Sequence, residues 1–146
     1  MGRGEGVPVV TRLVVLDNEA VQALARPHHP KHQRVLAHVE AVERRKRHAA
    51  AISLVVPAAV RVEAGWDRTS AQWAFLNRLR IMDVPLDAAQ ANAAAAVHEQ
   101  ARVSVADAHI GAVVLSAPDA DITVITSDPA DIRRVAGDCP VAVVAL

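Results

Sequence analysis

The chain is poor in cysteine and in aromatic residues. Its 146 residues include one cysteine, Cys139, which excludes an internal disulfide and a zinc site built from several cysteines. The aromatic residues are two tryptophans and one phenylalanine, with no tyrosine, which argues against a surface that binds nucleic acid mainly by base stacking. A single cysteine suits a reducing compartment, so we expect a cytoplasmic protein.

The sequence also lacks an excess of charge and a long apolar run. Sixteen basic and sixteen acidic side chains cancel, so any surface that binds nucleic acid must be local. No apolar run approaches a membrane span, and the first residues, MGRGEGVPVVTR, contain no apolar core of signal-peptide length. With 52% hydrophobic residues, the chain is predicted to form one globular domain over residues 9–146, after a flexible tail over residues 1–8.

Short apolar runs alternate with helical patterns along the chain. The runs LVVL (13–16) and ISLVV (52–56) are typical of strands that are buried on both faces of a parallel sheet. Further strands are expected over residues 80–84, 122–126 and 141–146. Because helical segments separate these strands, the chain is predicted to be a three-layer α/β/α domain with a mainly parallel sheet of about five strands.

Two acidic residues directly follow predicted strands. Asp17 comes after the first apolar run, and Asp128 follows Ser127 at the end of the strand over 122–126. The C-terminal ends of parallel strands share one edge of the sheet, where open α/β sheets place their chemistry. A purely structural explanation also fits, because Asp17 (or Asn18) and Asp128 stand at the N-cap positions of the helices that follow.

Two more acidic residues are predicted on helices near that edge. Asp107 lies three residues before Ile110 and continues the inward apolar stripe of its helix, although it also fits a capping pattern that begins at Ser104. Glu63 stands next to Val62, which we expect to face the core, so Glu63 is placed at the margin of the buried face.

Four carboxylates at one edge would raise one another's pKa unless a cation lay between them. A hard divalent ion with oxygen ligands, Mg²⁺ or Mn²⁺, would remove that repulsion, and it would supply an activated water and neutralise a phosphoryl transition state. The predicted metal ligands and catalytic residues are Asp17, Glu63, Asp107 and Asp128. These residues predict metal-assisted hydrolysis of a phosphodiester.

A basic run, ERRKRH, ends the helix predicted over residues 31–47. It is either a solvated helix end whose cations complement the helix dipole or a set of contacts to the RNA backbone. The residues of this second interpretation are Arg44, Arg45, Lys46 and Arg47.

Two further segments are candidates for protein contacts. Trp66, Trp73 and Phe75 lie on adjacent predicted helices and either form a core or anchor a partner helix. The Ala-rich helix predicted over residues 87–102 has the small side chains that allow close packing against a second copy of the chain.

The motifs LDNEA, PAAVRVEAGW, VADAHIGAVV and VITSDPADIRRV, in this order, resemble those of PIN-domain ribonucleases, and most of all the VapC toxins of bacterial toxin–antitoxin pairs. The resemblance spans about residues 13–144 and places the family's four acids on the four acids named above. The family's small hydroxyl residue before the fourth acid matches Ser127, whereas Asn18 replaces the Ser or Thr that often follows the first. The resemblance implies Mg²⁺-dependent cleavage of RNA, a homodimer, and a cognate antitoxin that blocks the acidic site.

Other functions remain open. A phosphatase of the haloacid-dehalogenase type also has an Asp after a buried strand, but it needs a second Asp two residues later, where Glu19 stands, and neither Lys31 nor Lys46 is suitably placed. The chain also fits a housekeeping PIN nuclease without an antitoxin, or a PIN-like module that has lost activity and only binds a partner. The presence of all four acids argues against such a loss.

Overall fold

The computed structural model describes residues 11–48 and 51–146, so the tail predicted over residues 1–8 lies outside the described residues. At its centre is a five-stranded sheet in the order β3-β2-β1-β4-β5, in which every neighbouring pair is parallel. The strands are β1 (Arg12–Leu16), β2 (Ile52–Pro57), β3 (Ile81–Val84), β4 (Asp121–Thr126) and β5 (Ala142–Ala145). This arrangement confirms the predicted parallel α/β sheet.

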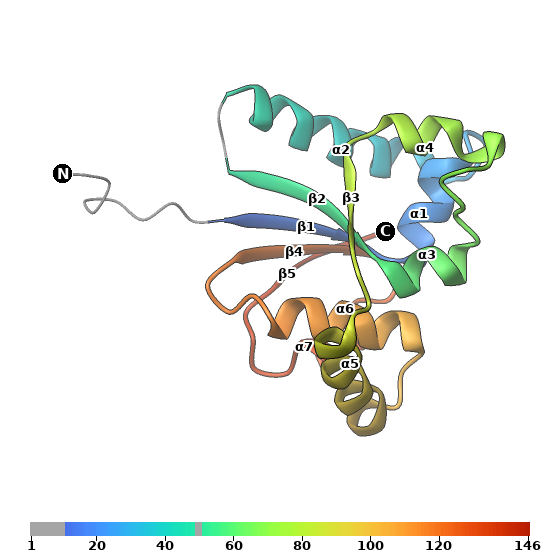
Figure 1. The fold of residues 1–146 in the computed structure, drawn as a ribbon. Helices are drawn as coiled ribbons and strands as arrows, with labels where there is room; N and C mark the ends of the chain where they lie inside the picture. Colours follow the sequence, from blue (N-terminus) through green and yellow to red (C-terminus); the bar gives the residue numbers. More distant parts are fainter. Residues whose placement is uncertain (1–10, 49–50) are drawn as a thin grey trace.

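Helices cover both faces of the sheet. In the described part of the chain they are α1 (Asn18–Ala25), α2 (His32–Arg47), α3 (Ala58–Ala64), α4 (Ala74–Arg78), α5 (Ala88–Ala101), α6 (Val105–Leu115) and α7 (Pro129–Ala136). As Figure 1 shows, α1, α2 and α4 lie on one face, α5, α6 and α7 lie on the other, and α3 stands near the edge where the strands end. None of the described helices is long and apolar enough to cross a membrane.

The core lies on both faces of the central strands, against α1 and α2 on one side and α6 on the other. Val15, Leu16, Val124 and Ile125 in β1 and β4 have no exposed surface, as expected for strands covered on both faces. On the side of α5 and α7, α6 carries Gly111, where an added Cβ would lie 3.0 Å from side-chain carbons of both α5 and α7. The lack of a side chain there lets both helices approach α6, which carries Asp107 at its N-terminal end.

The inward face predicted for α3 was wrong. Val62 is 81% exposed, and the buried residues of α3 are Ala59, Val60 and Ala64. The reason is that α3 begins directly at the end of β2, and this start turns Val60 instead of Val62 toward the core. Glu63 follows on the helix as an exposed residue.

The two tryptophans form a core, as one of the two interpretations predicted. Trp66 and Trp73 are 2% and 6% exposed, and their ring centroids lie 6.1 Å apart in a stacked arrangement. Phe75 differs, because it is 38% exposed on the surface of α4. The tryptophans are therefore unavailable to a partner, whereas Phe75 is accessible.

Candidate functional site

Asp17 directly follows β1, the central strand, at the end of the sheet where all the parallel strands terminate. Its side chain is 5% exposed and accepts hydrogen bonds from the backbone N–H of Ala20 (2.8 Å, Oδ1) and of Ser127 (3.2 Å, Oδ2). Asp17 therefore caps α1 and also ties β1 to the end of β4. Burial raises the pKa of Asp17, while hydrogen bonds from Thr126, Ala20 and Ser127 act in the opposite direction.

Thr126, the last residue of β4, is a site residue that the sequence analysis missed. It has no exposed surface, its hydroxyl accepts a hydrogen bond from the backbone N–H of Asp128 (2.9 Å), and it interacts with the carboxyl of Asp17. The hydroxyl residue predicted at this place, Ser127, is exposed and contributes its backbone N–H instead. No alternation of exposed and buried residues could have separated the two positions, because Val124, Ile125 and Thr126 are all buried in a strand that is covered on both faces.

Asp107 is the predicted acid whose surroundings contain the charges of the others. It is half-buried in the first turn of α6, and its backbone N–H is capped by Ser104 at 3.1 Å. Burial and the neighbouring negative charges raise the pKa of Asp107 to about 6. These charges, in order of effect, are Asp131, Asp17, Glu63 and Asp128. The charges of the three other predicted acids therefore reach Asp107.

The acids come from separate elements. Asp128 is exposed, and its Oδ1 caps α7 by accepting a hydrogen bond from the N–H of Asp131 at 3.2 Å. Asp131, which the sequence analysis did not count among the acids of the site, forms an ion pair with Arg134. The sequence could have predicted that Asp131 lies near Asp128, because residues three apart share one side of a helix.

A buried histidine joins the helices that carry two of these acids. His109 in α6 has no exposed surface, and its Nδ1 accepts a hydrogen bond from the backbone N–H of Ala59 at 3.2 Å. Burial lowers the pKa of His109, which keeps the ring neutral and its Nδ1 available as an acceptor. Since the N-cap of α3 is Pro57, which makes no side-chain cap, His109 serves as the cap from another helix and fixes α3, with Glu63, against α6, with Asp107.

The residues fit a hydrated divalent cation. Within residues 11–48 and 51–146, no three Asp, Glu, His or Cys side chains are arranged to hold one ion directly, so the prediction that all four acids reach a single ion is not met by direct contacts. Mg²⁺ keeps several waters and takes only one or two carboxylates directly, so the oxygen donors present suit it. Next to Asp17, the buried Oδ1 of Asn18 meets no hydrogen-bond donor among the described residues and is free to accept from a bound water.

The basic run of α2 lies away from this site. Helix α2 leads back from the edge with the acids to the start of β2, so Arg44, Arg45, Lys46 and Arg47 lie near the opposite edge of the sheet (Figure 1). The 16 residues of α2 span about 24 Å. This placement does not support contacts to phosphates beside the acids, and a role in binding more distant RNA stays a prediction.

Comparisons with known proteins identify the fold. No family model and no curated protein matches the sequence. A solved structure of FitAB bound to an IR36 DNA fragment matches with a TM-score of 0.57 and 19% identity, covering 90% of this chain and 94% of that chain. A structure of VapBC2 from Rickettsia felis bound to a DNA fragment from their promoter matches with a TM-score of 0.54 and 12% identity, covering 90% and 96%. At such identities the likeness is one of fold, and the chain is a PIN-like α/β domain.

Proposed function

We propose that the chain is a Mg²⁺- or Mn²⁺-dependent endoribonuclease of the VapC toxin type, acting in the cytoplasm on unpaired RNA. The observation that supports this most is the environment of Asp107, where the charges of four other carboxylates add to burial and raise its pKa to about 6. Such mutual repulsion is the cost of assembling acids that hold a cation, and perturbed pKa values of this kind cluster at functional sites.

Asp17, Asp107, Glu63 and Asp128 would hold the ion, directly or through water. When bound, the ion supplies an activated water and neutralises charge on the phosphoryl group. The hydrogen bonds to Asp17 favour its charged form and fix the direction of its carboxylate. Asn18 and Asp128 would orient water, and His109 would keep α3 and Glu63 in place.

The activity is tested with purified protein and RNAs that contain stems and loops. We expect cleavage in the loops with Mg²⁺ or Mn²⁺, and none after EDTA is added, because the proposed chemistry needs the ion. A fully double-stranded RNA serves as the substrate control. Cleavage that persists in EDTA, or no cleavage of any RNA with either ion, would contradict the proposal.

Asp107→Asn is expected to stabilise the metal-free protein and to abolish its stabilisation by Mg²⁺. The pKa of Asp107 rises from an ordinary 3.8 to about 6 on folding, so the folded protein binds more protons than the unfolded chain between these values. The free energy of unfolding therefore falls as the pH rises from about 4 to 6, and the partly exposed Asp107 accounts for about 1–2 kcal/mol of this loss.

This effect is measured by thermal unfolding at about pH 5 and pH 7.5, with and without Mg²⁺. Mg²⁺ should raise the Tm of the wild type mainly at the higher pH, where Asp107 is ionised. Asp119→Asn, an exposed acid that follows α6 near the opposite edge of the sheet, is the matched control and should leave the response to Mg²⁺ unchanged. An equal response to Mg²⁺ in Asp107→Asn would show that this carboxylate takes no part in holding the ion.

We further propose an antitoxin as partner, because the sequence resembles VapC toxins and one similar fold is that of VapBC2. A groove of about 400 Å³ lies between α2 and α4. Its apolar lining consists of Leu36, Val39, Phe75 and Leu79, and its charged lining of Glu40, Glu43, Arg44 and Arg47. This combination suits an amphipathic helix.

The toxin role predicts that expression of the chain alone slows growth and that co-expression of the neighbouring small gene product restores it. If expression alone is harmless while the purified protein cleaves RNA, the housekeeping nuclease becomes the better assignment. If the protein binds a partner without cleaving RNA, the inactive module is favoured.

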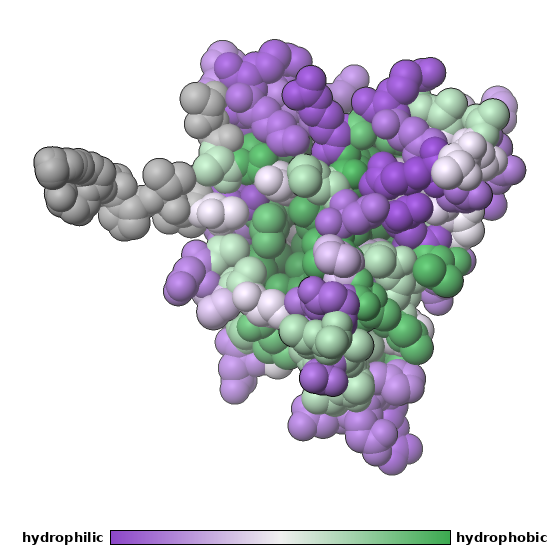
Figure 2. Space-filling model, viewed as in Figure 1, coloured by the Kyte–Doolittle hydropathy of each residue, from purple (hydrophilic) through white to green (hydrophobic). Residues whose placement is uncertain are grey.

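We also propose a homodimer. Figure 2 shows hydrophilic residues over α2, and hydrophobic residues interspersed with hydrophilic ones around β3 and α5. Leu86, beside α5, is 41% exposed and Val105 at the start of α6 is 57% exposed, and both line an apolar groove along α5. A second copy covering this surface would remove apolar area from water. Light scattering should then give the mass of a dimer.

The phosphatase alternative is not supported by the surroundings of Glu19. Its carboxylate lies 3.4 Å from Nε2 of His29 and 3.7 Å from Nζ of Lys31. These contacts tie the carboxylate of Glu19 to the segment between α1 and α2, so it lacks the freedom of a general acid beside Asp17.

A further inference from the structure

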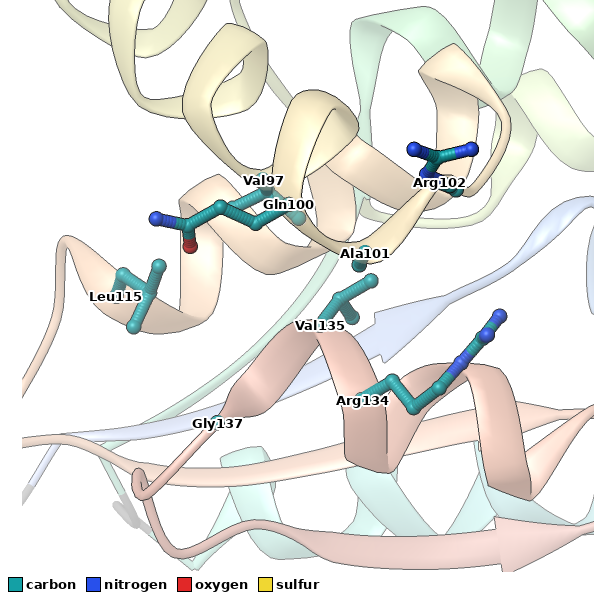
Figure 3. A pocket seen from close by; sticks show the side chains of 8 residues that line it. All are labelled: Val97, Gln100, Ala101, Arg102, Leu115, Arg134, Val135 and Gly137. Carbon is teal, nitrogen blue, oxygen red and sulfur yellow. The ribbon is translucent and has the colours of Figure 1, made fainter.

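A second groove, of about 580 Å³, lies between α5 and α7 and has α6 beneath it (Figure 3). Its walls combine apolar and cationic side chains. The apolar lining consists of Val97, Ala101, Leu115 and Val135, and the polar lining consists of Gln100, Arg102 and Arg134. A groove of this size and mixture is within the range of small-molecule sites.

The two arginines stand at the end of the groove nearest the acids. Leu115 is the last residue of α6, whereas Arg102 comes just before its N-cap, Ser104. Figure 3 shows the guanidinium groups of Arg102 and Arg134 at one end and Leu115 at the other. Because Asp107 lies in the first turn of α6, the cationic end of the groove adjoins the acidic site.

Arg102 has an unusual backbone for a residue with a side chain. It ends α5 in the left-handed conformation (φ 55°, ψ 47°), a position that usually holds glycine. Its side chain forms no hydrogen bond or ion pair with the described residues, so no internal contact of the guanidinium offsets this strain. The conformation itself closes the C-terminal end of α5, because the backbone N–H of Arg102 donates to the carbonyl oxygen of His98 at 3.0 Å, and it leaves the guanidinium exposed beside the groove.

Arg134 connects the groove to the acids, because it pairs with Asp131, whose charge acts on Asp107. Arg61 and Arg68, near β3, pair with Asp83 at 2.9 Å and 3.0 Å, and the charge of Asp83 is not among those that shift the pKa of Asp107. An RNA strand that approaches five carboxylates needs nearby positive charge. Arg102 and Arg134 supply it at the α5–α7 side of the site.

We propose that this groove binds the nucleotide of the RNA strand that adjoins the scissile phosphate. Arg102 and Arg134 bind its phosphate, in the charge-assisted geometry that guanidinium groups favour. The base packs against the more exposed apolar lining, Ala101 and Leu115, and the amide of Gln100 faces a base edge. The inference rests on the proposed ribonuclease function and names where that function's substrate is held.

The experiment measures binding of a labelled single-stranded RNA by fluorescence anisotropy, in Mg²⁺ and in an Asp17→Asn background that prevents cleavage. Arg102→Gln and Arg134→Gln should each raise the Kd about 5- to 10-fold and reduce the slope of log Kd against log salt by about 1. Arg133→Gln, an exposed arginine one position from Arg134 that does not line the groove, is the matched control and should change the Kd less than about twofold.

Arg102→Gly separates a binding role from a structural one. Glycine adopts the left-handed conformation without strain, so this variant should have a higher Tm than the wild type and yet bind RNA as weakly as Arg102→Gln. If the Arg102 variants and Arg134→Gln bind like the Arg133→Gln control while the wild type cleaves RNA, the groove inference is overturned and the nuclease function stands. If the wild-type protein neither binds nor cleaves RNA, both fail.

Discussion

Replacing Asp17 with Asn is expected to lower the rate of RNA cleavage by about three orders of magnitude while leaving the fold intact. Asn is as good an N-cap as Asp, so it still accepts the hydrogen bond from the N–H of Ala20 and α1 is retained. The loss is elsewhere, because a neutral amide gives a divalent ion a weaker ligand at the centre of the site. It also places an NH₂ group where Oδ2 now accepts from Ser127.

The matched control for this substitution is Glu19→Gln, which changes an acid two residues away that pairs with His29 and Lys31. Its cleavage rate should stay within about threefold of the wild type, because Glu19 is outside the proposed set of metal ligands and its charge has the smallest effect among the groups that shift the pKa of Asp17. Initial cleavage rates with Mg²⁺ and thermal melts of both variants are the measurements. A folded Asp17→Asn protein whose rate lies within about tenfold of the wild type would exclude Asp17 as a principal metal ligand.

Thr126→Val is expected to lower both stability and activity, although the two side chains have nearly the same shape. The part-buried N–H of Asp128 loses its acceptor, which should reduce the free energy of unfolding by about 1 kcal/mol. Asp17 loses a hydrogen bond that favours its charged form, so its pKa should rise further. Substitutions of groups that orient metal ligands typically reduce activity about 10- to 100-fold, and we expect a loss in this range.

Thr126→Ser keeps the hydroxyl and is the control for this position. It should recover most of the activity, whereas Thr126→Val should also shift the acidic limb of the pH–rate profile toward higher pH. Urea unfolding gives the change in stability, and cleavage rates across pH give the profile. Equal behaviour of the valine and serine variants would mean that packing at residue 126, and not its hydroxyl, is what the site requires.

Much of the fold was determined by local sequence patterns. The apolar runs that became β1, β2 and β4 predicted strands buried on both faces, and the helical segments between them required a parallel sheet. From this topology alone, Asp17 and Asp128 were expected at one edge. These features follow from periodicity and connectivity, which short stretches of sequence encode directly.

The residues of the candidate site could be predicted only in part from the sequence. Asp17, Glu63, Asp107 and Asp128 were predicted from the sequence, and in the structure the charges of the other three act on Asp107. The tertiary structure added Thr126, which no local pattern indicated, and Asp131, whose spacing from Asp128 was visible in the sequence but had not been used.

The tertiary structure also decided which cations lie near the acids. The run of four basic residues at the end of α2 was the obvious candidate in the sequence, yet it lies toward the opposite edge, while Arg102 and Arg134, 32 positions apart in the chain, line one groove. The physical reason is that a pattern specifies how strongly each residue of an element is buried. Which side chains of separate elements meet depends on how α3, α5, α6 and α7 pack around the edge, and contacts such as those of Gly111 and His109, which no local pattern contains, set that packing.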